Sequence, residues 1–353
     1  MAINQPEYKS FIKLGGGSET ERCFYPLKVD TYGRGCVSDC TYCYAKSVLD
    51  FRKLWDAENP AVSDYGKIEK IFGDVFDKGK ETKWSELLKQ KMPVRIGGMT
   101  DCFGTPERKH QVTLRFLQLL KRYEYPYQIF TKNALVAEEP WLTALDKDLA
   151  YVQFSITTPY DDVCTVHEEG ASVTSERLKA MGVLSRRGFY LAGRINPLFP
   201  IYPDGYYSGT RKFLLEDPKP LRYFDWSLVD MLAAHGCNTV IAGFVRLSPW
   251  NIKWMKEKTG EDFTYLFAPT AKHDNQALHF STEEKRYYYE KMQKQSHELG
   301  MAFSVCYDGD DAYHSFQYLW ENQNDCCNAK GHIPGFKVAY DFFNGDFGKK
   351  DAK

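Results

Sequence analysis

The sequence predicts an α/β fold built on a parallel sheet. Short apolar strands alternate with longer amphipathic segments, six such strand and helix units follow one another within 353 residues, and the strands carry polar side chains on one face. Six β/α units over this length favour a closed or partly closed barrel in one domain over two separate domains.

The first unit begins with the apolar stretch VRIGG at 94–98. It is followed by TPERKHQVTLRFLQLLKRY, where Thr105 is expected to cap a helix and Pro106 to occupy its first position. Apolar side chains then recur at helical spacing, at Val112, Phe116, Leu119, Leu120 and Tyr123. This segment predicts a strand followed by one helix.

The pattern repeats along the chain. The later strands are expected at 127–133, 150–157, 190–196, 238–244 and 301–307. Their helices are expected in AEEPWLTALDKD, TSERLKAMGVLSRRG, FDWSLVDMLAAHG and STEEKRYYYEKMQKQSHEL. Parallel strands need such crossover helices, so the series predicts one continuous sheet.

Two of these strands alternate polar and apolar residues. The polar-side residues are Gln153, Ser155 and Thr157 in one strand and Ala192, Arg194 and Asn196 in the other. Because the outer face of a β/α barrel packs apolar residues against helices, this set should point into the lumen and indicates an occupied cavity. An edge strand with one solvated face is the alternative.

Composition predicts a cytoplasmic globular protein. The formal net charge is −1, the opening MAINQPEYKS lacks a signal-peptide pattern, and no stretch approaches the roughly 20 apolar residues of a membrane span. In a reducing compartment the ten cysteines should not form a disulfide framework. Cys23, Cys164 and Cys237 are expected as buried small hydrophobes, whereas clustered cysteines indicate metal or redox ligands.

Cys36, Cys40 and Cys43 lie within eight positions, in GCVSDCTYC. A structural zinc site needs four ligands, and no second pair is nearby. Three thiolates can instead hold three irons of a 4Fe-4S cluster and leave the fourth iron without a protein ligand. A three-cysteine zinc site completed by a remote histidine, or an inert cluster, remains the alternative.

The CxxxCxxC spacing, with Tyr42 before the last cysteine and a strand before the first, resembles the radical S-adenosylmethionine superfamily. GCVSDCTYCYAKSVL, GGMTDCFGTPERKHQVT, IFTKNAL, VQFSITT, EEGASVTSERLKAMGVLSRRGF and GRINPLFP occur in the order seen in its branch related to spore photoproduct lyase. The resemblance covers residues from about 34 to 200, and the later third matches less clearly.

The resemblance implies a partial (β/α)6-type TIM barrel of the radical SAM kind. The barrel would span residues 28–307, after an N-terminal extension at 1–27 and before a C-terminal extension at 308–353 packed on it. The implied cofactors are a 4Fe-4S cluster on Cys36, Cys40 and Cys43 and S-adenosyl-L-methionine. Together they give a 5′-deoxyadenosyl radical that removes hydrogen from a substrate.

The resemblance also implies the residues that contact the S-adenosylmethionine. Gly97 and Gly98 would lie beside its methionine end, and Lys132, Ser155 and Arg194 would bind its carboxylate or ribose. The full set of expected contacts is Tyr42, Gly97, Gly98, Thr100, Asp101, Lys132, Ser155 and Arg194. Glycines let backbone amides approach a ligand closely, and polar groups at strand ends face the usual barrel site.

One departure from the lyase pattern concerns the hydrogen donor. Photoproduct lyases carry a cysteine shortly before the aspartate that aligns with Asp101, whereas this chain has Gly98 and Met99 there. Its nearest thiol is Cys102, a candidate catalytic hydrogen donor or else a buried loop cysteine. Direct photoproduct repair is therefore in doubt, and an isomerase would not need such a donor.

A local excess of positive charge lies between Glu176 and Arg222, with nine Lys or Arg against four Asp or Glu. Tyrosines are interleaved with it, at Tyr190, Tyr202, Tyr206 and Tyr207. Basic side chains and aromatic rings suit a nucleic acid or modified nucleoside, and a solvated helix face followed by a turn-rich loop explains the same residues.

The C-terminal region adds three cysteines. Cys306, Cys326 and Cys327 could ligate a second cluster or could be buried thiols, and DGDD at 308–311 is expected as a turn.

The sequence thus predicts a radical SAM enzyme acting on a nucleobase or nucleic acid. Isomerisation or modification of a substituted thymine is favoured at least as much as lyase-type DNA repair. An electron donor such as flavodoxin or ferredoxin is expected as a partner, and no membrane. A non-catalytic Fe-S or zinc protein that binds nucleic acid is the rival from another class.

Overall fold

The computed structural model describes residues 8, 11–13, 25, 27–200, 223–260, 263, 272–274, 277–306, 316–322, 325–334 and 336. Cys23, the DGDD segment and residues 201–222 of the basic region lie outside this set. No helix of the described residues is both long and apolar enough to cross a bilayer.

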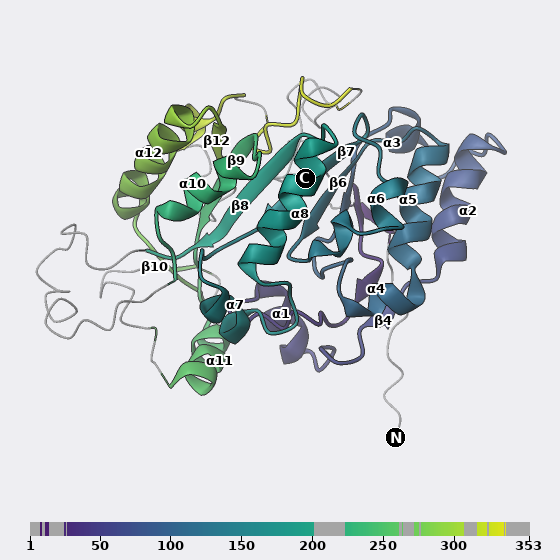
Figure 1. Ribbon diagram of the computed structural model, residues 1–353. Helices are drawn as coiled ribbons and strands as arrows, with labels where there is room; N and C mark the ends of the chain where they lie inside the picture. Colours follow the sequence, from purple (N-terminus) through teal and green to yellow (C-terminus); the bar gives the residue numbers. More distant parts are fainter. Residues whose placement is uncertain are drawn as a thin grey trace, which may run out of the picture.

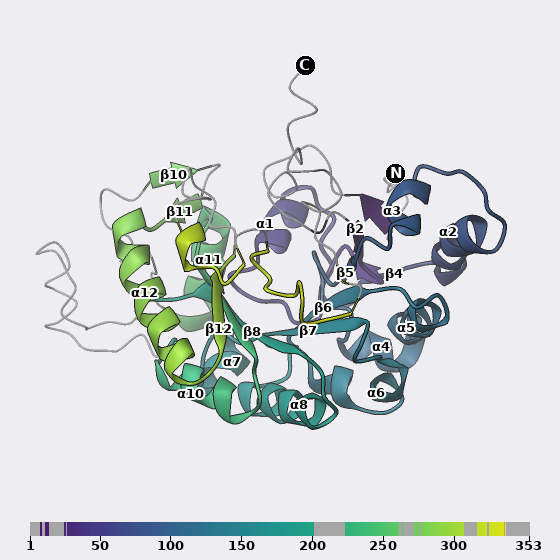
Figure 2. The ribbon, with the colours of Figure 1, turned by 90° about the horizontal axis from the view of Figure 1, so that it is seen from above.

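The centre of the molecule is an eight-stranded sheet in the order β1-β2-β5-β6-β7-β8-β9-β12. Only β1 and β2 pair antiparallel; the other neighbours are parallel. The strands are β1 (Phe11–Lys13), β2 (Leu27–Val29), β5 (Val94–Ile96), β6 (Tyr127–Thr131), β7 (Ala150–Ser155), β8 (Leu191–Leu198), β9 (Thr239–Phe244) and β12 (Ala302–Val305). Figures 1 and 2 show it as a curved sheet whose two ends do not meet.

Helices line the outer, convex face of this sheet, as the view from above shows (Figure 2). The longer helices of the structure are α2 (Tyr65–Phe76), α5 (Val112–Arg122), α8 (Thr174–Arg186), α10 (Ser227–Ala234), α11 (Pro249–Thr259) and α12 (Thr282–Glu298). The shorter helices are α1 (Tyr44–Phe51), α3 (Ser85–Lys89), α4 (Thr105–His110), α6 (Trp141–Ala144), α7 (Asp161–His167), η1 (Ala134–Ala137) and η5 (Gln317–Leu319). α1 and α11 lie outside the outer layer, in contact with each other. Two small sheets pair β3 (Tyr32–Gly33) with β4 (Ala61–Val62) and β10 (Lys272–Asp274) with β11 (Ala277–His279).

All six strands expected from the sequence are present, and the partial barrel is confirmed in its open form. The proposed boundaries at 27/28 and 307/308 stay predictions. β1 precedes the first boundary but belongs to the main sheet, because it pairs with β2.

The helix expected over 105–123 is wrong in detail, because it is two helices. Gln111 adopts a left-handed conformation with φ of 51° between α4 and α5. The buried Glu107 carboxylate accepts the N–H groups of Thr113 and Leu114. It therefore caps the start of α5, whose first N–H groups would bind the preceding helical turn if the helix were continuous. The N-cap of α4 is Gly104, and Thr105, expected as the cap, is its first helical residue.

The helix expected in AEEPWLTALDKD is also shorter than predicted. The chain forms η1 before Pro140 and the four-residue α6 after it. Proline has no N–H to donate to the preceding turn, which explains why one helix does not run through this position.

The two faces of the sheet differ as the sequence predicts. A Cβ placed on Gly193 would meet the Leu232 side chain of α10 at 2.7 Å, so this position of β8 faces the helices. Its neighbour Arg194 therefore points to the inner face, where it donates to Gln153 Oε1 at 2.9 Å. Gln153 in turn donates to Gln128 Oε1 at 2.9 Å. The inner face is polar.

The described C-terminal segment 325–334 lies against this inner face (Figure 2). The Tyr151 hydroxyl of β7 donates to the Cys327 carbonyl, and the His332 ring stacks on Tyr190 with centroids 4.3 Å apart. The buried Asp325 carboxylate accepts the N–H groups of Cys327, Ala329 and Lys330, which fixes the turn. The segment therefore covers part of the concave side of the barrel.

Candidate functional site

The three cysteines lie on the loop between β3 and α1. Asp39 N–H donates to the Cys36 carbonyl at 3.0 Å and Cys43 N–H to the Cys40 carbonyl at 3.1 Å, so two consecutive turns bring the thiols to one region. Cys43 is the N-cap of α1, and its Sγ accepts the N–H of Lys46 at 3.4 Å. Cys36 and Cys40 are buried.

The surroundings of these thiols suit anionic sulfur once a metal is bound. Cys36 Sγ accepts the N–H of Asp101 at 3.3 Å, which links the cysteine loop to the loop after β5. In the protein alone, burial raises the pKa of all three thiols, that of Cys43 to about 11. Bound iron would supply the positive charge that the buried thiolates need.

The cysteine loop is tightly enclosed by neighbouring backbone. A Cβ on Gly35 would lie 1.7 Å from the Asp56 carbonyl oxygen, and a Cβ on Gly170 would lie 1.8 Å from the Val37 carbonyl oxygen. Only glycine fits at either position. The segments around residues 56 and 170 therefore shield the loop.

Among the described residues, no group of three His, Cys, Asp or Glu side chains is arranged to hold a single metal ion. A 4Fe-4S cluster does not require that arrangement, because each of its cysteines binds a different iron.

The glycine pair after β5 forms a tight turn beside the cysteine loop. Gly97 has φ of +85°, and a Cβ there would meet the Phe130 carbonyl oxygen at 2.5 Å. Gly98 N–H donates to Asp30 Oδ1 at 2.7 Å, and the Gly98 carbonyl accepts the Tyr44 hydroxyl at 2.8 Å. Tyr44 is the residue after Cys43, so the two loops are in direct contact.

Asp101 and Thr100 have partners within the chain. The Asp101 carboxylate accepts the Thr131 hydroxyl at 2.9 Å and the Lys132 N–H at 2.6 Å. The Thr100 hydroxyl donates to the Gly35 carbonyl at 3.0 Å. In this structure both residues fix the loops around the cysteines.

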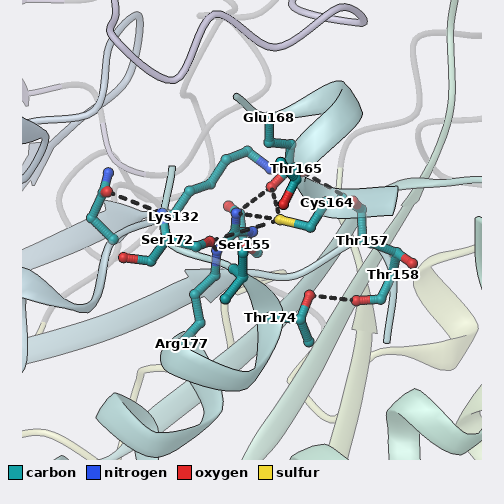
Figure 3. A network of polar contacts seen from close by, with 12 residues as sticks. Lys132, Ser155, Thr157, Thr158, Cys164, Thr165, Glu168, Ser172, Thr174 and Arg177 are labelled. Atoms are coloured by element: carbon teal, nitrogen blue, oxygen red, sulfur yellow. Dashed lines mark hydrogen bonds and ion pairs between the residues drawn. The ribbon is translucent and has the colours of Figure 1, made fainter. Parts of the chain in front are cut away.

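Lys132, which follows β6, belongs to a buried charge network (Figure 3). Its Nζ donates to Glu168 Oε1 at 2.8 Å and to the Tyr42 hydroxyl at 3.0 Å. Glu168 also accepts the Tyr42 hydroxyl and pairs with Arg177, whose side chain is fully buried. Arg177 further donates to the carbonyls of Ser155 at 2.7 Å and Ser172 at 2.6 Å.

One carboxylate thus faces two cations in this network. Burial lowers the pKa of Lys132 to about 8, and burial also raises the pKa of Glu168, which Arg177 partly opposes. The Lys132 ammonium lies 5.3 Å from the centre of the Tyr42 ring. Since Tyr42 lies between Cys40 and Cys43, the network borders the cysteine loop.

Arg194 does not join this network through any contact described. Its Nη2 donates to Cys306 Sγ at 3.1 Å, and its guanidinium lies over the Phe130 ring. The expected cofactor contacts therefore divide, with Tyr42 and Lys132 at the cysteine loop and Arg194 on the inner wall. Ser155 ends β7 and presents its carbonyl to Arg177.

Cys102 is enclosed by the protein. Its side chain is fully buried, the Thr113 hydroxyl donates to its carbonyl at 2.7 Å, and burial raises the pKa of its thiol. These surroundings favour the alternative of a packing cysteine over a hydrogen donor at the mouth of the barrel.

Within the described part of the basic region, residues 176–200, the arginines do not lie on one surface. Arg177 is buried in the Glu168 network and Arg194 pairs with Cys306. Arg186 and Arg187 are exposed at the end of α8, which leads back to the start of β8. They therefore lie at the edge of the sheet opposite the strand ends that carry the site.

Sequence reasoning missed Glu168, Arg177, Asp30 and Gly170 as parts of the site. Glu168 and Arg177 stand nine positions apart among other charged residues, and no local spacing distinguishes them from a solvated pair. One signal could have identified Glu168 and Gly170: both belong to EEGASVTSERLKAMGVLSRRGF, one of the stretches that carry the resemblance.

No family model matches the sequence, and no curated protein matches it either. Among solved structures, a double mutant of spore photoproduct lyase with bound AdoMet and dinucleoside spore photoproduct superposes with a TM-score of 0.58. The two are 15% identical, over 84% of this chain and 79% of that chain. Spore photoproduct lyase complexed with the dinucleoside spore photoproduct gives 0.54, at 15% identity over 83% and 78%. The chain therefore has an open α/β barrel fold similar to that of spore photoproduct lyase.

Proposed function

We propose that the protein is a radical SAM enzyme. The observation that carries the proposal is the direct link between three clustered thiols and the glycine-pair loop, through the hydrogen bond from Asp101 N–H to Cys36 Sγ. Cys36, Cys40 and Cys43 would hold a 4Fe-4S cluster. With S-adenosylmethionine bound, this cluster would supply the electron that cleaves the cofactor and generates a radical able to remove hydrogen from carbon.

The chain's own residues would bind and orient the cofactor. Asp30 holds the Gly98 N–H and so fixes the backbone that would face the methionine end. Lys132 and Tyr42 would meet the carboxylate or ribose, while Glu168 keeps its ion pair with Arg177. The buried loops would exclude water from the reacting atoms.

The favoured substrate is a nucleobase or nucleic acid. Three solved structures of similar fold contain the dinucleoside spore photoproduct, and the inner face of the present chain carries amide and guanidinium donors suited to base edges. The absence of a cysteine at Gly98 or Met99 and the burial of Cys102 favour isomerisation or modification of a substituted thymine over lyase-type repair. Flavodoxin or ferredoxin would donate the electron.

The test is anaerobic reconstitution of the full chain. Wild-type protein should bind close to four irons and four sulfides and, after reduction with dithionite, convert S-adenosylmethionine into 5′-deoxyadenosine and methionine. Joint replacement of Cys36, Cys40 and Cys43 by Ala should abolish both, whereas Cys237→Ala should abolish neither. Zinc without iron uptake, or iron binding without 5′-deoxyadenosine, would refute the enzyme and favour the non-catalytic rival.

A second measurement tests the cofactor contacts. Lys132→Met should weaken binding of S-adenosylmethionine to the reconstituted protein by roughly tenfold or more, because a charge-assisted contact contributes about 1 to 3 kcal/mol. The control must be an exposed lysine: replacing a buried one, such as Lys285, would also disturb packing. Lys147→Met, at an exposed surface pair, is the matched control and should leave the affinity unchanged.

A further inference from the structure

A second group of cysteines, Cys306, Cys326 and Cys327, lies on the inner face of the barrel. In sequence it is far from the cysteine loop at 36–43. Cys306 follows β12, and its N–H donates to the Ala242 carbonyl of β9 at 2.7 Å. The Ser304 hydroxyl donates to the Cys326 carbonyl, which holds the C-terminal segment beside the end of β12. Ser304 lies two residues before Cys306, so this contact places Cys326 beside Cys306, close enough for each thiol to shift the pKa of the other.

The charges around Cys306 are positive. Arg194 of β8 donates to its Sγ at 3.1 Å, and the charge of Arg95 of β5 also acts on it. Both guanidinium groups lie over the Phe130 ring, each 5.1 Å from its centre. Cys306 is half-buried, whereas Cys326 and Cys327 are buried. A partly exposed sulfur in a cationic site is the setting of a reactive cysteine.

We propose that Cys306 and Cys326 form a redox-active dithiol, in which the Cys306 sulfur attacks a disulfide of low molecular weight and Cys326 resolves the mixed disulfide. The proposal is separate from the cluster chemistry, since it uses none of the cysteines of the cysteine loop and needs no iron.

The acidities of the two thiols support these roles. The neighbouring Cys326 thiol lowers the pKa of Cys306 well below its usual value, and Arg194 and Arg95 add to the effect. The Cys306 thiol in turn raises the pKa of Cys326. Attack by one thiolate and later deprotonation of the other is the order that thiol–disulfide exchange requires.

The neighbouring cysteine is a poorer partner for Cys326. The Cα atoms of adjacent residues are about 3.8 Å apart, below the usual disulfide range of about 4.4 to 6.8 Å. Cys327 is also fixed by its own backbone, because its N–H binds Asp325 and its carbonyl binds Tyr151. Closure between Cys306 and Cys326 leaves those contacts intact.

The reaction balances as two exchanges. The Cys306 thiolate bonds to one sulfur of the small disulfide, and the other sulfur leaves as a thiolate. Cys326 then loses its proton to solvent and attacks the Cys306 sulfur, which releases the second small thiolate. The dithiol loses two electrons, the small disulfide gains them, and one proton is released.

The experiment treats anaerobically purified full-length protein with glutathione disulfide and maps the products by peptide mass spectrometry. Wild-type protein should form a bond between Cys306 and Cys326, with the loss of two hydrogens. Cys326→Ser should instead retain one glutathione on Cys306, and Cys306→Ser should leave Cys326 unmodified. Arg194→Gln should slow the first step roughly tenfold, because it removes a charge that stabilises the thiolate.

Cys237→Ser is the matched control. Cys237 is a buried thiol that donates to the Thr239 carbonyl, and its replacement should change neither the product nor its rate. Circular dichroism and thermal melting verify that each variant folds. A bond between Cys326 and Cys327, glutathione on Cys326 or Cys327 first, or a Cys306 that reacts no faster than Cys237 would overturn the proposal.

Discussion

At the scale of single residues, Glu168 is the group on which the site depends most. Its carboxylate pairs with both Lys132 and Arg177 and accepts the Thr157 hydroxyl at 3.1 Å. Arg177 has no solvent exposure, so its charge must be balanced inside the protein. Loss of one partner from such a buried pair leaves an uncompensated charge.

We expect Glu168→Gln to lower the free energy of unfolding by about 3 kcal/mol, because the amide keeps the shape but not the charge that offsets Arg177. The control is the neighbouring Glu169→Gln, which breaks an exposed pair with Lys258 and should cost less than about 1 kcal/mol. Urea denaturation of the two variants measures the difference. Equal losses would show that the Glu168 charge does not stabilise the fold.

His167 gives the protein a pH-dependent stability. It is buried against Tyr223, its Nδ1 lies 2.8 Å from the Thr41 hydroxyl, and burial lowers its pKa from 6.5 to about 4. The unfolded chain therefore binds this proton at a higher pH than the folded chain. The stabilisation is complete above pH 6.5 and is lost as the pH falls towards 4.

Between pH 7.5 and pH 5, this residue should remove about 2 kcal/mol from the free energy of unfolding. His167→Asn can keep a hydrogen bond to Thr41 and cannot take up the proton, so it should flatten the pH dependence by that amount. His110→Asn, at an exposed position, should leave the slope as in wild type. Denaturation curves at both pH values supply the comparison, and parallel slopes for His167→Asn and wild type would contradict the assignment.

At the scale of elements, the sequence predicted the strands better than the helices. The alternation of residues along the strands was predictable because the two faces of the sheet have different environments. Gly193 packs on Leu232 at the outer, helix-covered face, and Arg194 binds Gln153 at the inner face. The break at Gln111 was not predictable, because it depends on the Glu107 carboxylate reaching the next helix. Local spacing singled out the cysteines, and the resemblance singled out Lys132. Neither could place Arg194 on Cys306, a contact between distant strands.

The turn after β5 is an element whose conformation can be tested directly. Gly97→Ala adds a methyl group that meets the Phe130 carbonyl oxygen and also forces φ of +85° on alanine. Gly79 has φ of +61° with open space around it, so Gly79→Ala isolates the conformational cost. We expect about 1 kcal/mol for Gly79→Ala and about 3 kcal/mol for Gly97→Ala. Similar unfolding midpoints for the two variants would indicate that the turn relaxes without cost.

At the scale of the whole molecule, the C-terminal segment connects the middle of the open sheet, at β7, with its edge at β12. Asp325 is fully buried and receives three backbone N–H groups. Through this turn the segment contacts β7 at Tyr151 and β12 at Ser304. An open barrel lacks the strand pairing that would close it. The segment supplies other contacts, which link β7 and β12 across the inner face of the sheet.

Asp325→Ala should therefore release the segment and destabilise the protein by on the order of 3 kcal/mol, since several buried N–H groups lose a charged acceptor. Hydrogen–deuterium exchange should rise in β7 and β12, which contact the segment, and stay unchanged in α2 and α5 on the outer face. Asp146→Ala is the control, because in its own loop that carboxylate accepts the N–H of Asp148 at 3.0 Å, and it should affect only its surroundings. Unchanged exchange in β7 and β12 would mean that the segment does not hold the inner wall together.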